Sequence, residues 1–168
     1  MTAFLGGLVQ FFIPTHLLAV VALALLAGQH ARPTRADMPG MLIVGLIIGS
    51  AVIALAMRET PSASALLVLA ALAASVVVVG RPTPPAVGVV LAFAIGVALP
   101  LNAPPHEITI PAAIAAQTGF AVAALAAFAL VTVVAMQATR PWQRIGVRIV
   151  ASWIAASAIL VLALRLTR

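Results

Sequence analysis

Three side chains in this sequence could together coordinate a transition-metal ion. His16 lies inside an apolar stretch, and His106 is followed directly by Glu107 in a short segment that contains prolines. Imidazole and carboxylate groups bind divalent ions such as nickel, cobalt and zinc, and an imidazole can also relay protons. The simpler alternatives are a neutral His16 hydrogen-bonded between helices and a solvated His106–Glu107 pair. The residue types alone leave both interpretations open.

The stretch around His16 is interrupted by polar residues and by a proline. Residues 4–27 carry no formal charge, but they include Gln10, Pro14, Thr15 and His16. Because Pro14 has no N–H, the Gln10 carbonyl loses its helical hydrogen-bond donor. Polar groups within a membrane helix usually face protein or a cavity. We therefore expect a kink at Pro14, with Gln10, Thr15 and His16 directed into a helical bundle.

Other polar residues of the apolar regions are fewer and less specific. Gln117 and Thr118 lie together in a long apolar stretch, where an amide needs several hydrogen-bond partners. We expect both residues in the bundle interior, either joining two helices or lining a site. His30 falls in a polar segment, 29–40, and is expected to be solvated on the side opposite to His106.

The composition is typical of a polytopic helical membrane protein. The chain of 168 residues is 64% hydrophobic and only 7% charged, and its mean hydropathy is +1.25. The apolar runs are continuous, unlike the alternating pattern of a membrane β-barrel. The absence of cysteine excludes disulfides, iron–sulfur ligation and thiolate metal sites. All nine basic residues are arginines scattered through short segments, so nucleic-acid binding is not expected.

The fold predicted is all-α, a bundle of six short transmembrane helices in one membrane domain over residues 1–168. The expected spans are 4–27, 41–57, 61–79, 86–101, 110–136 and 149–166. The first residues show no basic segment or cleavage pattern, so the first span is expected to be retained. No nucleophile–base pair or pair of catalytic carboxylates is evident, and we expect neither enzymatic activity nor a resident cofactor.

Arginine counts predict the orientation of these spans. Six arginines fall in the segments on one side of the predicted bundle and three on the other. The positive-inside rule places the six-arginine side in the cytoplasm. Both termini and the segment 102–109 should then face outward, with the surrounding lipid bilayer as the first partner of the chain.

Small residues recur at four-residue spacing in two of the expected spans. Gly45 and Gly49 fall in the second span, and Gly88, Ala92 and Gly96 fall in the fourth. Such stripes allow helix backbones to approach closely. Packing within the chain is the simpler expectation, and contact with another protein is the alternative.

The run from Thr15 to Gln29 resembles the first-helix signature of the HupE/UreJ family, bacterial membrane proteins associated with hydrogenase and urease genes. The six short helices, the His106–Glu107 segment and the run around Gln117 are similar as well. The resemblance implies an inner-membrane location and uptake of nickel or cobalt from the outer side. The family's first motif has histidine, aspartate and histidine where this chain has Val9, Thr15 and His16, so the ligand set is reduced to His16, His106 and Glu107.

Two functions follow from this reduced ligand set. The first is a non-catalytic accessory subunit that uses the scaffold to pack against other subunits of a larger membrane complex. The alternative is a permease for a divalent ion such as nickel or cobalt that operates with fewer ligands. The missing ligands favour the accessory subunit.

Overall fold

The computed structural model describes residues 1–30, 32–56, 63–81, 83–104 and 109–167, and every regular element in these ranges is an α-helix. The expected all-α class is therefore confirmed for the described residues. The helices are α1 (Thr2–Phe11), α2 (Pro14–Gln29), α3 (Arg32–Ala56), α4 (Ala63–Val79), α5 (Pro85–Leu101), α6 (Ile110–Met136) and α7 (Pro141–Leu166).

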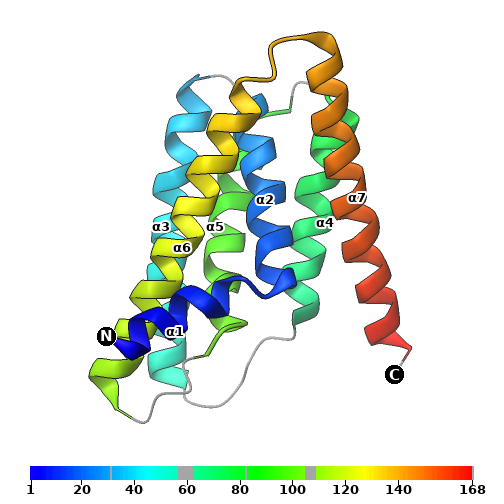
Figure 1. The fold of residues 1–168 in the computed structure, drawn as a ribbon. Coiled ribbons are helices and arrows are strands. Elements are labelled where there is room, and N and C mark those ends of the chain that lie inside the picture. Colours follow the sequence, from blue (N-terminus) through cyan, green and yellow to red (C-terminus); the bar gives the residue numbers. More distant parts are fainter. Residues whose placement is uncertain (31, 57–62, 82, 105–108, 168) are drawn as a thin grey trace.

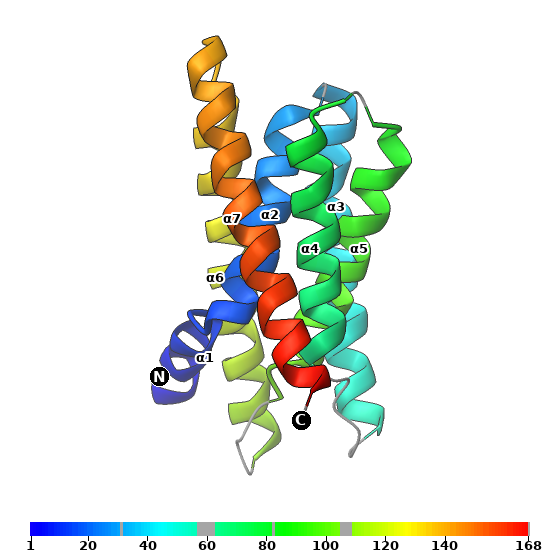
Figure 2. The ribbon, with the colours of Figure 1, turned by 90° about the vertical axis from the view of Figure 1, so that its right-hand side faces the viewer.

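Helix α2 is the centre of the bundle. It packs against α4 and α6 and also contacts α3, α5 and α7, whereas α3 packs on α5 and α4 on α7. Figures 1 and 2 show these helices running side by side, with α1 lying obliquely across the lower part of α6. The residues from Ala22 to Ala27 are all buried alanines and leucines. Small and branched apolar side chains allow α2 to be enclosed by its neighbours without voids.

The apolar helices support the assignment to the membrane, but the six-span count is not confirmed. Three helices are long and apolar enough to cross a bilayer, and a fourth crossing results if α1 and α2 together form one bent span. Helices α4 and α5, of 17 residues each, extend only about 26 Å, which is short of the ~30 Å hydrocarbon core. The outward faces of α3, α6 and α7 carry large exposed apolar side chains, as lipid contact requires; examples are Ile47, Leu55, Leu130, Val134, Ile145, Trp153 and Leu160.

The expected single kinked helix over 4–27 is wrong. The chain breaks between Phe11 and Pro14, and the two helices are bent by 68° relative to each other. Pro14 begins α2 in the first helical turn, where its missing N–H costs no hydrogen bond. The break is therefore sharper than the kink that was expected at Pro14.

Two helices begin well before the expected spans. Helix α3 starts at Arg32, not at residue 41, and α7 starts at Pro141, not at residue 149. Most of the segment 29–40 is thus helical and not the expected loop. The physical reason is that hydropathy marks where a helix enters lipid, whereas backbone hydrogen bonding continues into the polar turns beyond it. Pro33 and Pro141 lie in first turns, which tolerate proline.

Glycines allow a close contact between helices α3 and α5. A Cβ atom at Gly45 would lie 2.5 Å from the Phe93 carbonyl oxygen, and one at Gly49 would lie 2.4 Å from that of Val97. Gly96 on α5 meets α3 in the same way, at the Leu42 carbonyl. These three glycines therefore lie within one contact between α3 and α5, inside the chain. Ala92 is fully buried on the same helix.

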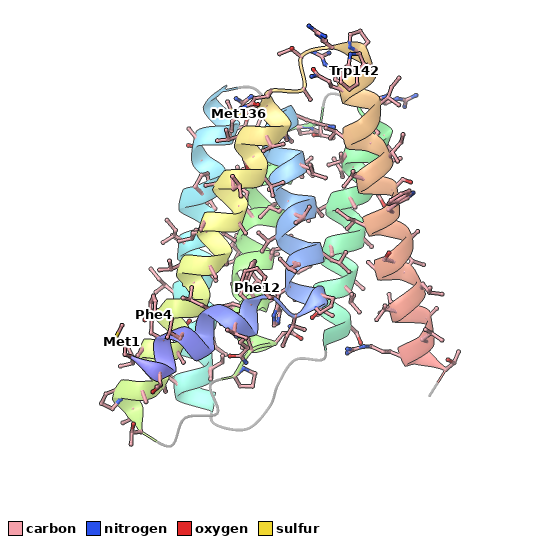
Figure 3. The ribbon with its side chains drawn as sticks, viewed as in Figure 1. Met1, Phe4, Phe12, Met136 and Trp142 are labelled. Carbon is pink, nitrogen blue, oxygen red and sulfur yellow. The ribbon has the colours of Figure 1, made fainter. Side chains whose placement is uncertain are left out.

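A second close contact was not foreseen in the sequence. A Cβ atom at Gly7 of α1 would lie 1.9 Å from the Ala116 carbonyl oxygen, and one at Gly119 of α6 would lie 2.2 Å from that of Phe4. This reciprocal pair of glycines holds α1 directly against the α6 backbone. In Figure 3, α1 is the helix that runs from near Phe4 to just before Phe12.

The two ends of the bundle differ in charge. Arg35, Arg81 and the arginines of the first turns of α7 lie at the end where α6 finishes, and both chain termini lie toward the other end (Figure 1). Which end faces the cytoplasm remains a prediction from the positive-inside rule.

Labelling of single cysteines tests this orientation, and the chain has no native cysteine to interfere. Thr139 is exposed at the arginine-bearing end, and Thr109 and Thr167 are exposed at the other. A membrane-impermeant thiol reagent added to intact cells should label Thr109→Cys and Thr167→Cys, but should label Thr139→Cys only after the membrane is opened. Labelling of Thr139→Cys in intact cells would reverse the orientation.

The contact between α3 and α5 should not tolerate even a methyl group at Gly45. Gly45→Ala forces a backbone shift against the Phe93 carbonyl, for which overpacking predicts a loss of about 1–3 kcal/mol. Gly40→Ala on the same helix meets no atom within 4 Å and is the matched control. Thermal unfolding of both variants in detergent measures the difference, and equal stability would contradict the close approach.

Candidate functional site

The helix break before Pro14 positions His16 against the Gln10 carbonyl, to which Pro14 can donate no N–H. His16 Nδ1 lies 3.2 Å from the Gln10 carbonyl oxygen. A carbonyl only accepts hydrogen bonds, so Nδ1 is the protonated nitrogen in this contact and donates to it. The same carbonyl also accepts from the Ile13 backbone N–H at 3.3 Å, so the imidazole is a second donor at the corner between α1 and α2.

His16 faces protein and not lipid. Its side chain is only 1% exposed, and the edge of its ring meets Phe120 of α6 at a centroid distance of 5.2 Å. Phe120 in turn packs on Phe11 at 5.9 Å, in a second edge-to-face contact. The backbone of Asn102, just after α5, also lies within hydrogen-bonding range of His16. Residues from α1, α2, α5 and α6 thus converge on one imidazole.

Two amides hold the chain that follows α5 in place beside this corner. Gln10 Nε2 donates to the Pro104 carbonyl at 3.4 Å, and Gln117 Nε2 donates to the Ala103 carbonyl at 3.1 Å. Gln117 Oε1 is buried and has no hydrogen-bond partner in the described residues. Gln10 and Gln117 are thus half-buried at contacts between segments, and one buried acceptor is without a hydrogen-bond partner among the described residues.

The predicted metal site can be located only in part. His106 and Glu107 lie outside the described residues, and within these residues no three His, Cys, Asp or Glu side chains come together. The described part of the site thus offers one imidazole, and a nickel or cobalt ion requires several donors.

The remaining interior predictions have mixed outcomes. Thr15 is half-buried at the start of α2. The interior assignment of Thr118 is wrong, because its side chain is exposed and donates to the Ala115 carbonyl of its own helix at 2.8 Å. A hydroxyl that bonds one turn back needs no interhelical partner, so the residue can face outward.

The expectation for His30 is also wrong, because this side chain is buried at 8% exposure. Its Nδ1 lies 2.9 Å from the Leu26 carbonyl, and its Nε2 lies 3.2 Å from the Thr83 hydroxyl. Gly88 of the α5 stripe lies beside the same ring, since a Cβ atom there would be 3.4 Å from His30 Nε2 and 3.2 Å from Met38 Sδ. His30 is removed from solvent because its ring contacts α2, the α4–α5 connection and α5.

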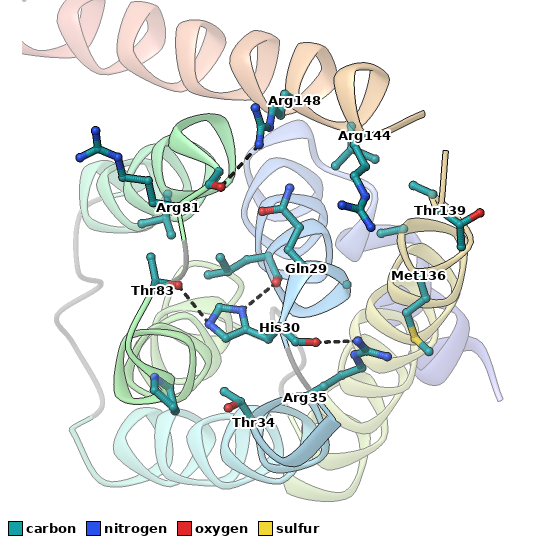
Figure 4. Close-up of a pocket in the computed structure, with 18 residues that line it drawn as sticks. Gln29, His30, Thr34, Arg35, Arg81, Thr83, Met136, Thr139, Arg144 and Arg148 are labelled. Atoms are coloured by element: carbon teal, nitrogen blue, oxygen red, sulfur yellow. Dashed lines mark hydrogen bonds between the residues drawn. The ribbon is translucent and has the colours of Figure 1, made fainter. Parts of the chain in front are cut away.

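His30 is one wall of a cavity that the sequence analysis missed. The cavity holds about 650 Å³ at the arginine-bearing end, between the ends of α2, α4 and α6 and the starts of α3 and α7 (Figure 4). Its basic lining residues are Arg35, Arg81, Arg144 and Arg148. The grouping of these arginines on one side was visible in the sequence. Their convergence depends on the early starts of α3 and α7, which place Arg35, Arg144 and Arg148 on helical turns.

Two of these arginines are held by backbone carbonyls. Arg35 donates to the His30 carbonyl, and Arg148 donates to the Gly80 carbonyl at 3.4 Å. Gly80 has a left-handed φ of 62°, and a Cβ atom there would overlap the Arg148 guanidinium. Glycine adopts this φ without strain and has no Cβ atom to collide with the guanidinium. Gly80 therefore allows the turn after α4 to lie against Arg148.

No protein-family profile matches the chain, and no curated protein or solved structure is significantly similar to it. The resemblance to the HupE/UreJ family stays a prediction.

Replacing His16 tests the polar corner. His16→Leu keeps the volume near Phe120 but leaves the Gln10 carbonyl without its side-chain donor. We expect a loss of about 0.6 kcal/mol, and at most ~1.7, the range measured for interhelical polar contacts in membranes. Thr118→Val, which removes only a hydrogen bond within one helix, is the control. Thermal unfolding in detergent gives both values, and an unchanged His16→Leu variant would show that the contact adds no stability.

Proposed function

We propose that this protein is a non-catalytic accessory subunit of a larger membrane complex, in which the bundle serves as a packing scaffold. The observation that carries the proposal is the filling of the bundle centre. Between His16 and His30, which are about 21 Å apart along a regular helix, the buried side chains of α2 are alanines, valines and leucines. The described residues thus place apolar packing where a transport path would need polar groups.

The distribution of polar groups supports the same proposal. Most described polar contacts between segments gather at two ends, around His16 and Gln117 at one and around His30 and Arg35 at the other. Between them, the buried Thr132 hydroxyl of α6 donates to the Ala24 carbonyl of α2 at 3.4 Å, which again is a bond to the backbone. At each end most of the donors bond to backbone carbonyls and so support helix ends and connections. A scaffold needs such contacts for stability, whereas a carrier needs groups that exchange partners with its cargo.

The outer surface offers area for a protein partner as well as for lipid. Helix α7 packs mainly on α4 and extends its remaining apolar face outward, with Trp153 71% exposed near mid-helix. An aromatic side chain at this depth lies away from the interfacial belts where tryptophan is usual in membranes. Contact with a second protein would bury this ring.

A divalent-ion permease is the second candidate function. It is favoured by one observation, the unpartnered Gln117 Oε1 beside the segment that leads to His106 and Glu107. Closure of residues 105–108 onto His16 would add two ligands, and the buried carboxylate would then be paired with the ion. Nickel or cobalt would be the cargo of such a site.

Purification of the natively expressed protein in mild detergent, with a tag free of histidine, separates the two functions. Mass spectrometry of proteins and metals in the same sample should find a protein partner in a fixed ratio, and nickel and cobalt at background level. Trp153→Ala should weaken retention of the partner if α7 is the contact, and Trp142→Ala on the same helix is the matched control.

The opposite result is equally specific. Micromolar nickel or cobalt binding in calorimetry that disappears in a His16→Ala/His106→Ala variant, but persists in His30→Ala, would overturn the accessory role and support the permease. His30→Ala removes an imidazole at the other end of α2 and controls for adventitious binding to histidine.

A further inference from the structure

The arginine-lined cavity has the size and position of a binding site. Its volume of about 650 Å³ lies within the range of roughly 300–1,000 Å³ that is usual for ligand pockets. Figure 4 shows Arg35 of α3 and Arg144 of α7 extending toward the space beside Met136 of α6, while Arg81 points away. Two guanidinium groups from different helices therefore approach the same space.

The positive charge of this cavity is not balanced by the described protein. Four arginines line it and no described carboxylate does. Asp37 is exposed and borders a separate depression on the outer side of α3, and the other two carboxylates, Glu59 and Glu107, lie outside the described residues. Like charges that share a cavity repel one another, so an anion bound between them would lower their mutual repulsion.

Hydrogen-bond donors also remain available. A guanidinium group has five N–H donors, and the described contacts of Arg35 use only one nitrogen, toward the His30 carbonyl. Arg35 Nε is buried and has no hydrogen-bond partner among the described residues. Buried polar groups are rarely left unpaired in folded proteins, so this donor indicates an acceptor beyond those that the described residues supply.

The lining combines the arginines with apolar side chains. Leu26, Val76, Met136 and Val147 are among the lining residues. Trp142, which is 65% exposed, lies at the same end of the bundle (Figure 3) and suits the membrane–water interface. The charged group of an amphiphilic ligand would contact the arginines here, and its apolar part would contact the apolar side chains.

We propose that this cavity binds an anionic phospholipid, with its phosphate held between Arg35 and Arg144 and its upper acyl chains along Met136 and Val147. Guanidinium groups pair well with phosphate oxygens because two N–H groups can donate to one phosphate. Basic pockets between helices on the cytoplasmic side are known places for such headgroups. The apolar walls favour a lipid over free phosphate. The proposal does not depend on the accessory role.

Native mass spectrometry of the full chain tests the site with phosphatidylglycerol as the probe, phosphatidylcholine as the zwitterionic comparison and inorganic phosphate as the free anion. Arg144→Gln is the main variant, because Arg144 is exposed and none of the described hydrogen bonds involves its side chain, so the fold should survive. We expect phosphatidylglycerol to bind more tightly than phosphatidylcholine. The affinity for phosphatidylglycerol should fall roughly tenfold in Arg144→Gln, because a tenfold change corresponds to the loss of about one charged hydrogen bond.

Two variants with the same loss of charge serve as controls. Arg140→Gln removes an arginine at the same end that does not line the cavity, and Arg165→Gln removes one from the other end of α7. Both should keep the wild-type affinity for phosphatidylglycerol. Arg35→Lys, which keeps the charge but loses the planar pair of donors, should weaken binding.

Three results would overturn the proposal. One is equal binding of the two lipids, and another is an equal loss of affinity in Arg140→Gln and Arg144→Gln, which would show a general charge effect. The third is binding of inorganic phosphate that depends on Arg144 while phosphatidylglycerol does not bind, which would assign the cavity to a free anion.

Discussion

The enclosure of α2 is the constraint on which the rest of the structure depends. A helix whose side chains from Ala22 to Ala27 are all buried must have neighbours on every side, and α3 to α7 all contact it. Half of this segment is alanine, so the neighbours approach closely and gain many van der Waals contacts. Such contacts drive helix association where lipid removes the hydrophobic effect. The glycines at the contacts of α3 with α5 and of α1 with α6 extend the same principle to the outer helices.

A centre filled in this way leaves most of the described polar contacts at the ends, apart from the Thr132 hydroxyl that donates to the Ala24 carbonyl. At one end, the Gln10 carbonyl accepts from the Ile13 N–H and from His16, and the side chains of Gln10 and Gln117 bond to the chain after α5. At the other end, His30 joins the end of α2 to the start of α5, and Arg35 and Arg148 hold backbone carbonyls. Both ends therefore follow the rule that a polar group near a membrane must find a partner in the protein.

The two ends nevertheless differ in what they leave unsatisfied. The end at His16 retains a buried acceptor, Gln117 Oε1, and the end at His30 retains a buried donor, Arg35 Nε. An acceptor suits a cation or a donor group, whereas a donor among arginines suits an anion. The chemistry that each end can support is thus opposite in sign, and the apolar packing of α2 separates them.

The sequence by itself determined the helical class, the apolar character and the break at Pro14, because these follow from composition and from the missing proline N–H. It also placed His16 and the glycines at 45, 49 and 96 in positions that the bundle uses for contacts. Only the tertiary structure decided the 68° bend, the burial of His30, the outward direction of Thr118 and the early starts of α3 and α7. The cavity between Arg35 and Arg144 belongs to this second group, since these residues are far apart in the chain. The physical reason is that hydropathy reports how a segment interacts with lipid, whereas the partners of a polar side chain depend on which helices pack together.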